Sequence, residues 1–118
     1  RTLASLYIEK GDWDSAIQTM STFVRKHPEP YMVYLLASAY DHEGHDAECE
    51  QTLGIAERLA PDLGAVPMLR GDRALRAGEL RKALEYYERA LALDPDRIGP
   101  DVQPKIYEVR KRLDSTEP

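Results

Sequence analysis

The chain has 118 residues, with 21 acidic and 16 basic side chains and a formal net charge of −5. This length fits one domain or a short array of small units. The acidic balance argues against a nucleic-acid partner, because affinity for phosphate depends on clustered lysine and arginine. The single cysteine excludes an internal disulfide. The longest apolar stretch, residues 31–40, is too short to cross a bilayer.

The chain opens at Arg1, already within an amphipathic pattern and without an initiating methionine. We therefore expect a piece of a longer protein, and the lack of a signal-peptide pattern has little meaning here. The sequence leaves the cellular compartment open, with the cytoplasm slightly favoured.

Hydrophobic periodicity predicts six helices in three pairs. In each pair a glycine ends the first helix, because glycine readily adopts positive φ. The second helix stops before a proline, which disfavours helical geometry in the residue that precedes it. The predicted helices cover residues 1–10, 12–26, 31–43, 45–59, 66–77 and 79–93.

The positions of these glycines and prolines reveal an internal repeat. Gly11, Gly44 and Gly78 are 33 and 34 residues apart (44 − 11 and 78 − 44). The prolines at positions 28, 61 and 95 keep the same spacings, and so do small residues at positions 16, 49 and 83. Agreement of several independent series is hard to produce by chance. A fixed period of this length indicates a stack of similar structural units.

The residues that recur in each unit allow a comparison with known repeats. The first unit has Leu3, Ala4, Tyr7, Gly11, Trp13, Ala16 and Pro28; the second has Leu36, Ala37, Tyr40, Gly44, Ala56 and Pro61; the third has Gly71, Gly78, Ala83, Tyr87, Ala90 and Pro95. This pattern resembles the tetratricopeptide repeat (TPR), a helix–turn–helix unit of about 34 residues. The resemblance implies an all-α fold, a right-handed superhelical solenoid of antiparallel helix pairs. It places repeats at 1–29 (truncated at its N-terminal side), 30–63 and 64–97.

Three positions depart from the family's pattern. Phe23 and Cys49 stand where a small alanine is usual, and Pro67 stands where a bulky aromatic residue is common. All three concern packing, so we expect them to affect local geometry only.

Residues after Pro95 follow a different pattern. The segment DRIGP, residues 96–100, is predicted to be a loop. Apolar residues then recur at gaps of four, three and four, at Val102, Ile106, Val109 and Leu113. One narrow apolar stripe on an otherwise polar helix is typical of a helix that caps the last repeat. We expect this capping helix at 98–114 and a tail at 115–118.

The stretch DHEGHDAEC, residues 41–49, raises the question of a metal site, because two histidines and a cysteine lie among four carboxylates. The repeat places this stretch at a turn around Gly44 and gives Cys49 the position of a small packing residue. A structural zinc site needs about four converging ligands, whereas only His42 and His45 are expected to be exposed here. We therefore expect a buried Cys49, no metal and no cofactor.

Other catalytic patterns are missing from the sequence. Every glycine is isolated, so the chain has no glycine-rich phosphate loop. The serines lack the context of a nucleophile elbow. The chain is therefore predicted not to be an enzyme.

In proteins that this chain resembles, the first helices of the repeats line a concave surface. The matching positions form the expected binding groove: Tyr31, Tyr34, Ser38, Asp41, His42, Met68, Asp72, Leu75 and Arg76. The same register adds Arg1, Ser5 and Glu9 in the first repeat and Val102 and Ile106 at the capped end. Tyrosine and methionine are common on binding surfaces. An alternative is that Tyr34 and Met68 pack between adjacent first helices.

The predicted function is a non-catalytic scaffold that binds a peptide or helix of another protein on its concave face, with no insertion into membranes. An acidic groove would prefer a ligand with Lys or Arg beside an apolar anchor. One alternative is a regulatory or targeting segment of a larger enzyme whose catalytic domain precedes Arg1. Another is a self-assembly module, a homo-oligomer formed through the uncapped N-terminal end or the cap stripe.

One subset of the family binds the C-terminal tails of chaperones. Its members hold the carboxylate of the tail with Lys, Asn and Arg side chains in the groove. The corresponding positions here are Arg1, Ser5, Leu35, Ala65 and Leu69. Only one of them suits a carboxylate, which argues against a chaperone co-factor of that kind.

Overall fold

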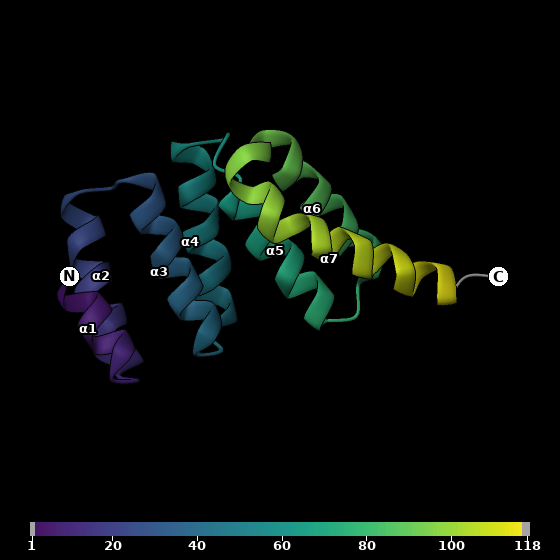
Figure 1. The fold of residues 1–118 in the computed structure, drawn as a ribbon. Coiled ribbons are helices and arrows are strands. Elements are labelled where there is room, and N and C mark those ends of the chain that lie inside the picture. Colours follow the sequence, from purple (N-terminus) through teal and green to yellow (C-terminus); the bar gives the residue numbers. More distant parts are fainter. Residues whose placement is uncertain (1, 117–118) are drawn as a thin grey trace. The chain divides into compact units, whose positions relative to one another are not determined.

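The computed structural model describes residues 2–116, and over that range it contains helices and no strand. The helices are α1 (Leu3–Glu9), α2 (Trp13–Lys26), α3 (Pro30–His42), α4 (Asp46–Leu59), α5 (Ala65–Arg76), α6 (Leu80–Leu93) and α7 (Pro95–Thr116). Figure 1 shows their order along the chain. The predicted all-α fold is therefore confirmed. The chain forms two compact units, residues 1–61 with α1–α4 and residues 62–118 with α5–α7.

The three repeat glycines form the turns inside the helix pairs. Gly11, Gly44 and Gly78 have φ values of +79°, +77° and +78°. A side chain on an L-residue disfavours this left-handed conformation, whereas glycine adopts it readily. Each of these glycines therefore ends one helix and turns the chain into the next, as the sequence predicted.

The first unit contains two helix pairs, α1 with α2 and α3 with α4, and α2 also contacts α3. One buried apolar cluster joins α1, α2 and α3; its members are Ala4, Ala16, Met20, Leu36 and Ala39. Alanines here let the helix backbones approach closely. Cys49 of α4 is completely buried, which confirms its predicted packing position.

In the second unit, α6 packs against both α5 and α7, and α5 and α7 also contact each other. Tyr87 of α6 is completely buried, and its ring lies against Gly71 of α5. A methyl group on Gly71 would lie 2.6 Å from one carbon of that ring, closer than carbon atoms approach in proteins. Tyr87 can therefore be buried here only because residue 71 is very small, as the repeat pattern requires at this position.

The capping helix begins earlier than the sequence predicted. Residues 96–100 are helical and belong to α7, so the prediction of a loop there was wrong. Pro95 is well suited to the first helical position, because that position needs no backbone N–H. Pro100 and Pro104 lie inside the helix, and α7 changes direction near its N-terminal end (Figure 1), as expected where prolines interrupt the hydrogen-bond ladder.

The apolar stripe of α7 packs as predicted, since Val102, Ile106 and Val109 are buried. At the other end, Ser115 and Thr116 belong to the helix instead of the expected tail, and residues 117–118 lie outside the described range. No helix within residues 2–116 combines the length and apolarity needed to cross a membrane.

Two departures from the repeat pattern have simple structural explanations. Pro67 is the third residue of α5, where backbone N–H groups have no partner inside the helix, so its missing N–H costs little. The Phe23 side chain is 45% exposed, so its size does not have to fit within a tight helix contact.

Candidate binding faces

Five of the predicted groove residues lie on α3, and we call them the α3 face: Tyr31, Tyr34, Ser38, Asp41 and His42. They recur at spacings of three and four along the helix, which places them on one side of it. Val33, Leu36 and Ala37 are buried on the opposite side. The packed side of α3 therefore holds the helix in place, and the α3 face remains half-buried to exposed.

The N-terminal half of the α3 face is an aromatic pair. The ring centroids of Tyr31 and Tyr34 are 5.6 Å apart, with planes inclined by 34°. The Tyr31 side chain is 49% exposed. Glu29 caps this end of the helix, and its carboxylate accepts hydrogen bonds from the backbone N–H groups of Tyr31 and Met32 at 3.2 and 3.1 Å. The cap thereby fixes the turn that carries the first tyrosine.

At the C-terminal end of the α3 face, the His42 side chain already contacts other residues of its own unit. Its ring stacks on Trp13 of α2, with centroids 3.8 Å apart and planes inclined by 15°. Its Nδ1 atom lies 3.8 Å from a carboxylate oxygen of Glu43. One face of the imidazole is therefore covered by Trp13, and His42 can contact a ligand through its edge or its other face.

The two histidines at the α3–α4 turn have different carboxylate neighbours. His45 lies with Nδ1 3.7 Å from Glu48, whereas His42 is beside Glu43. Among residues 2–116 there is no group of three or more His, Cys, Asp or Glu side chains arranged to hold a metal ion.

The other four predicted residues lie on α5, and we call them the α5 face: Met68, Asp72, Leu75 and Arg76. The first three are half-buried and Arg76 is exposed. Asp72 takes part in a polar cluster inside the second unit. Its Oδ1 atom accepts a hydrogen bond from the Tyr87 hydroxyl at 2.5 Å and another from Lys105 Nζ of α7 at 2.9 Å.

This polar cluster also shifts the pKa of Tyr87. Burial raises the pKa of Tyr87 well above its ordinary value, and the hydrogen bond to Asp72 and the negative charge of that carboxylate raise it further. The Lys105 ammonium lies 5.8 Å from the centre of the Tyr87 ring. Asp72 thus has two partners from its own unit, and a ligand cation would compete with Lys105 for it.

The expectation for the capped end of the groove was wrong. Val102 and Ile106 were expected to line a binding surface, but their relative exposures are 0% and 5%. The reason is that both belong to the stripe with which α7 packs on its own unit. Of the other expected groove residues, Ser5 is half-buried, Glu9 is exposed, and Arg1 lies outside the described residues.

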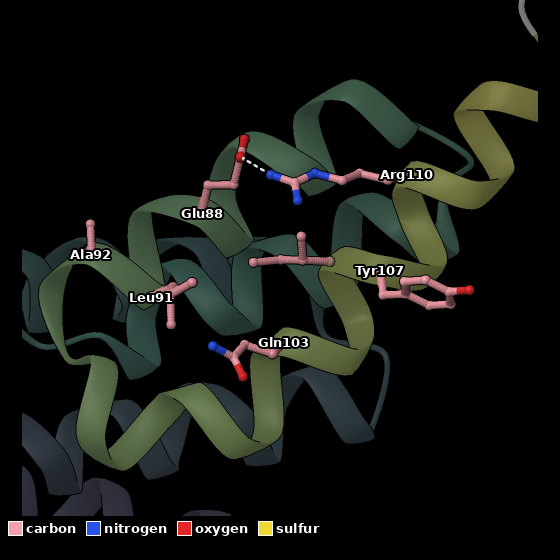
Figure 2. A pocket seen from close by; sticks show the side chains of 7 residues that line it. Glu88, Leu91, Ala92, Gln103, Tyr107 and Arg110 are labelled. Carbon is pink, nitrogen blue, oxygen red and sulfur yellow. Dashed lines mark hydrogen bonds and ion pairs between the residues drawn. The ribbon is translucent and has the colours of Figure 1, made fainter.

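The sequence reasoning missed an open pocket between α6 and α7, with a volume of about 490 Å³. Its apolar lining comes from Leu91, Ala92 and Ile106, and an ion pair of 2.7 Å joins Arg110 to Glu88 at its edge. Figure 2 shows the Arg110 side chain reaching toward α6, while the Tyr107 ring extends away from Leu91. The feature of the sequence that could have indicated this pocket is Tyr107, an aromatic residue outside the apolar stripe of the cap. Tyr107 is 70% exposed.

Comparison with family models decides the relationship that the repeat geometry indicated. The model for the tetratricopeptide repeat matches residues 1–62, more than half of the chain, and a second tetratricopeptide repeat model matches residues 68–97. The chain belongs to the tetratricopeptide repeat family. Comparison of this TPR domain with the curated proteins gives no match.

Solved structures of similar fold include TPR domains of other proteins. The first TPR of Spaghetti (RPAP3) bound to the HSP90 peptide SRMEEVD has 23% identity and a TM-score of 0.76; the alignment covers 93% of this chain and 86% of that one. The TPR2B domain of yeast Sti1 in complex with an Hsp70 peptide has 16% identity, a TM-score of 0.79 and coverages of 92% and 91%. PcrH in complex with the chaperone-binding region of PopD has 16% identity, a TM-score of 0.79 and coverages of 94% and 88%. At these identities the likeness establishes the fold of this TPR domain.

Four of the five positions expected to correspond to a carboxylate-binding groove are not suited to that chemistry in this TPR domain. Ala65 and Leu69 are buried and Leu35 is half-buried. The hydroxyl of Ser5 forms a hydrogen bond of 2.8 Å with that of Thr2. These four side chains carry no positive charge with which to hold a carboxylate.

Proposed function

We propose that this TPR domain is a non-catalytic interaction module that binds a peptide or helix of another protein on the first-helix side of its repeats. The α3 face is its main contact surface. The observation that carries the proposal is the Tyr31–Tyr34 pair, two neighbouring aromatic rings on a well-anchored helix with a polar rim of Ser38 and Asp41. Three proteins of the same fold, two of them described as TPR domains, are in complexes with peptides or a binding region of other proteins.

Tyrosine offers a large, rigid ring with few rotatable bonds, so little conformational entropy is lost when a ligand covers it. Such residues usually carry most of the energy of an interface. The buried side of α3 already fixes the helix, so binding does not have to order the backbone. A peptide that covers both rings could therefore gain affinity at low entropic cost.

The reactive side chains of the chain favour the same conclusion. Cys49 is completely buried, and a buried thiol without an electropositive surrounding is a poor nucleophile. The raised pKa of Tyr87 keeps its hydroxyl protonated, with the proton directed to Asp72. Neither group is available to a substrate, which supports a binding role for the domain.

Self-association is the second candidate function. Leu3 and Leu6 of α1 are 55% and 37% exposed, and exposed apolar side chains on one short helix favour contact with another protein surface. Light scattering during size-exclusion chromatography tests this candidate. A monomer at about 13 kDa, the chain mass, would eliminate it.

The proposed function is tested with a peptide selected on the domain from a random display library. Binding is measured by fluorescence anisotropy for the wild type and for Tyr34→Ala, with Tyr107→Ala of α7 as a matched tyrosine truncation. We expect Tyr34→Ala to weaken binding by about 1–3 kcal/mol, as at a good interface anchor, and Tyr107→Ala to leave it unchanged. If Tyr107→Ala weakens binding more, the α6–α7 pocket is the binding site and the proposal fails.

A further inference from the structure

The partner of the α3 face can be specified further by its charge. Resting on the proposed function, we infer that this face binds a basic segment, a peptide with Lys or Arg next to an apolar side chain. The inference depends on where the negative charge of the chain is located and on which side chains accompany the two tyrosines.

The net charge of the chain belongs to the unit that contains α3. Residues 1–61 include ten acidic and five basic side chains, a formal charge of −5. Residues 62–118 include eleven of each and are formally neutral. Clustered charge of one sign attracts partners of the opposite sign and accelerates their association. The first unit therefore favours a cationic partner, and the second unit adds no net charge of either sign.

The helix pair α3–α4 shows the imbalance most strongly. Between Lys26 and Arg58 the sequence has seven acidic residues and no lysine or arginine. Two of these carboxylates belong to the same helix as the aromatic pair: Glu29 caps its N-terminus, and Asp41 lies in its last turn. Asp41 lies at the negative end of the helix dipole, which adds to the attraction for a cation. Apart from Arg58 in the last turn of α4, the formal charges on this helix pair are negative, so a ligand anion would meet mainly like charges.

The tyrosines suit a basic ligand as well as the carboxylates do. A cation over the face of an aromatic ring gains about 0.5–1 kcal/mol at an exposed site. Lys and Arg side chains also carry long apolar stems that can cover an aromatic ring while the charged end remains in water. The inclined Tyr31–Tyr34 pair, with Tyr31 half exposed, offers such a surface. A stem placed across the rings would direct its charge toward a neighbouring carboxylate.

The charge of the preferred peptide distinguishes this domain from one of its structural relatives. The peptide in the Spaghetti (RPAP3) structure, SRMEEVD, contains three acidic residues and one basic residue. The α3–α4 pair should repel such a ligand, because like charges across an interface cost binding energy. A charge-reversed peptide, SRMKKVK, provides a probe of the same length with the opposite charge.

The test combines these two probes with a selection from a random dodecamer library. Among selected peptides whose binding is lost in Tyr34→Ala, we expect Lys and Arg to be enriched and Asp and Glu depleted. SRMKKVK should bind more tightly than SRMEEVD. Affinity for a selected peptide should fall about tenfold between low and physiological salt, because screening weakens these charge interactions.

Asp41→Asn tests the contribution of the rim carboxylate. It should reduce affinity about two- to fivefold, in the range of an exposed ion pair. Asp114→Asn on α7 makes the same change in net charge and should have no effect. Thermal unfolding of both variants checks that the fold is retained.

The outcomes distinguish the inference from the proposed function. Peptides that depend on Tyr34 but are acidic, or insensitive to salt, overturn the inference and leave the proposed function intact. Peptides that depend on Tyr107 and not on Tyr34 overturn both, and so does a library that yields no binder.

Discussion

At Gly71 the contact between α5 and α6 leaves room for a hydrogen atom and no more. We expect Gly71→Ala to destabilise the protein by about 1–3 kcal/mol, the usual cost of overpacking a core. The added methyl group would lie 2.6 Å from the completely buried ring of Tyr87, so the ring or the helix backbone would have to shift. Urea unfolding followed by circular dichroism measures the change.

Gly54 provides the matched control, because it also lies inside a helix but has no atom within 4 Å of an added methyl group. Gly54→Ala should stabilise the protein by about 0.5–1 kcal/mol, since alanine is the better helix former. Equal effects of the two substitutions would mean that helix propensity, and not the contact with Tyr87, determines the requirement at position 71.

A second residue-scale prediction concerns Tyr87 and pH. Tyr87→Phe removes a hydrogen bond to a charged group and should cost about 1.5–3 kcal/mol near neutral pH. The pKa of Tyr87 is raised in the folded protein above its ordinary value of 10.0. The unfolded chain therefore releases the phenol proton first, so the stabilisation is complete below pH 10 and declines as the pH rises beyond it.

The measurement is the difference in unfolding free energy between wild type and Tyr87→Phe from pH 8 to pH 11. This difference should be constant up to about pH 9 and then shrink. A difference that grows above pH 10 would contradict the assigned direction of the pKa shift.

At the residue scale, the sequence predicted positions that depend on one helix or one turn. Gly11, Gly44 and Gly78 could be assigned because positive φ is a local requirement, and Cys49 because its place in the repeat fixes its direction. The contact of Asp72 with Lys105 could not be predicted, because it depends on how α7 is rotated against α5. The stacking of His42 on Trp13 depends in the same way on the contact between two helix pairs.

At the scale of single helices, the ends are set by caps that can be tested directly. The side chain of Asp12 caps α2 and accepts a hydrogen bond from the backbone N–H of Ser15 at 3.2 Å. Asp12→Ala should cost about 0.5–2 kcal/mol in thermal or urea unfolding, whereas Asp12→Asn should be close to wild type, because asparagine caps equally well. If the two variants are equally unstable, the cap is not what Asp12 contributes.

Helix α7 shows where element prediction from sequence is weakest. Its apolar stripe from Val102 to Val109 was recognisable, because periodicity records which side of a helix is buried. Its start was misplaced, because glycine and two prolines within residues 95–100 are common in loops. Tertiary packing of Ile98 and Gly99, both buried, outweighs these local preferences and keeps the segment helical.

At the scale of the whole molecule, the two units differ in net charge and in the side chains on the α3 and α5 faces. The α5 face has its carboxylate engaged by Tyr87 and Lys105, and its unit is formally neutral. The α3 face presents two tyrosines in a unit of charge −5. We therefore expect binding to be concentrated on the α3 face of the first unit. Family resemblance alone could not predict this asymmetry, because function in a repeat fold lies in the side chains on its surface.

The central claim is that a ligand binds at the α3 face. The most direct test is nuclear magnetic resonance of the isotope-labelled 118-residue chain, titrated with a peptide selected on the wild-type domain. The account predicts that the largest chemical-shift changes occur at the backbone amides of Tyr31, Tyr34, Ser38 and Asp41, and that they are lost in Tyr34→Ala. Changes centred instead on Leu91, Gln103 and Tyr107, around the pocket between α6 and α7 (Figure 2), would contradict it.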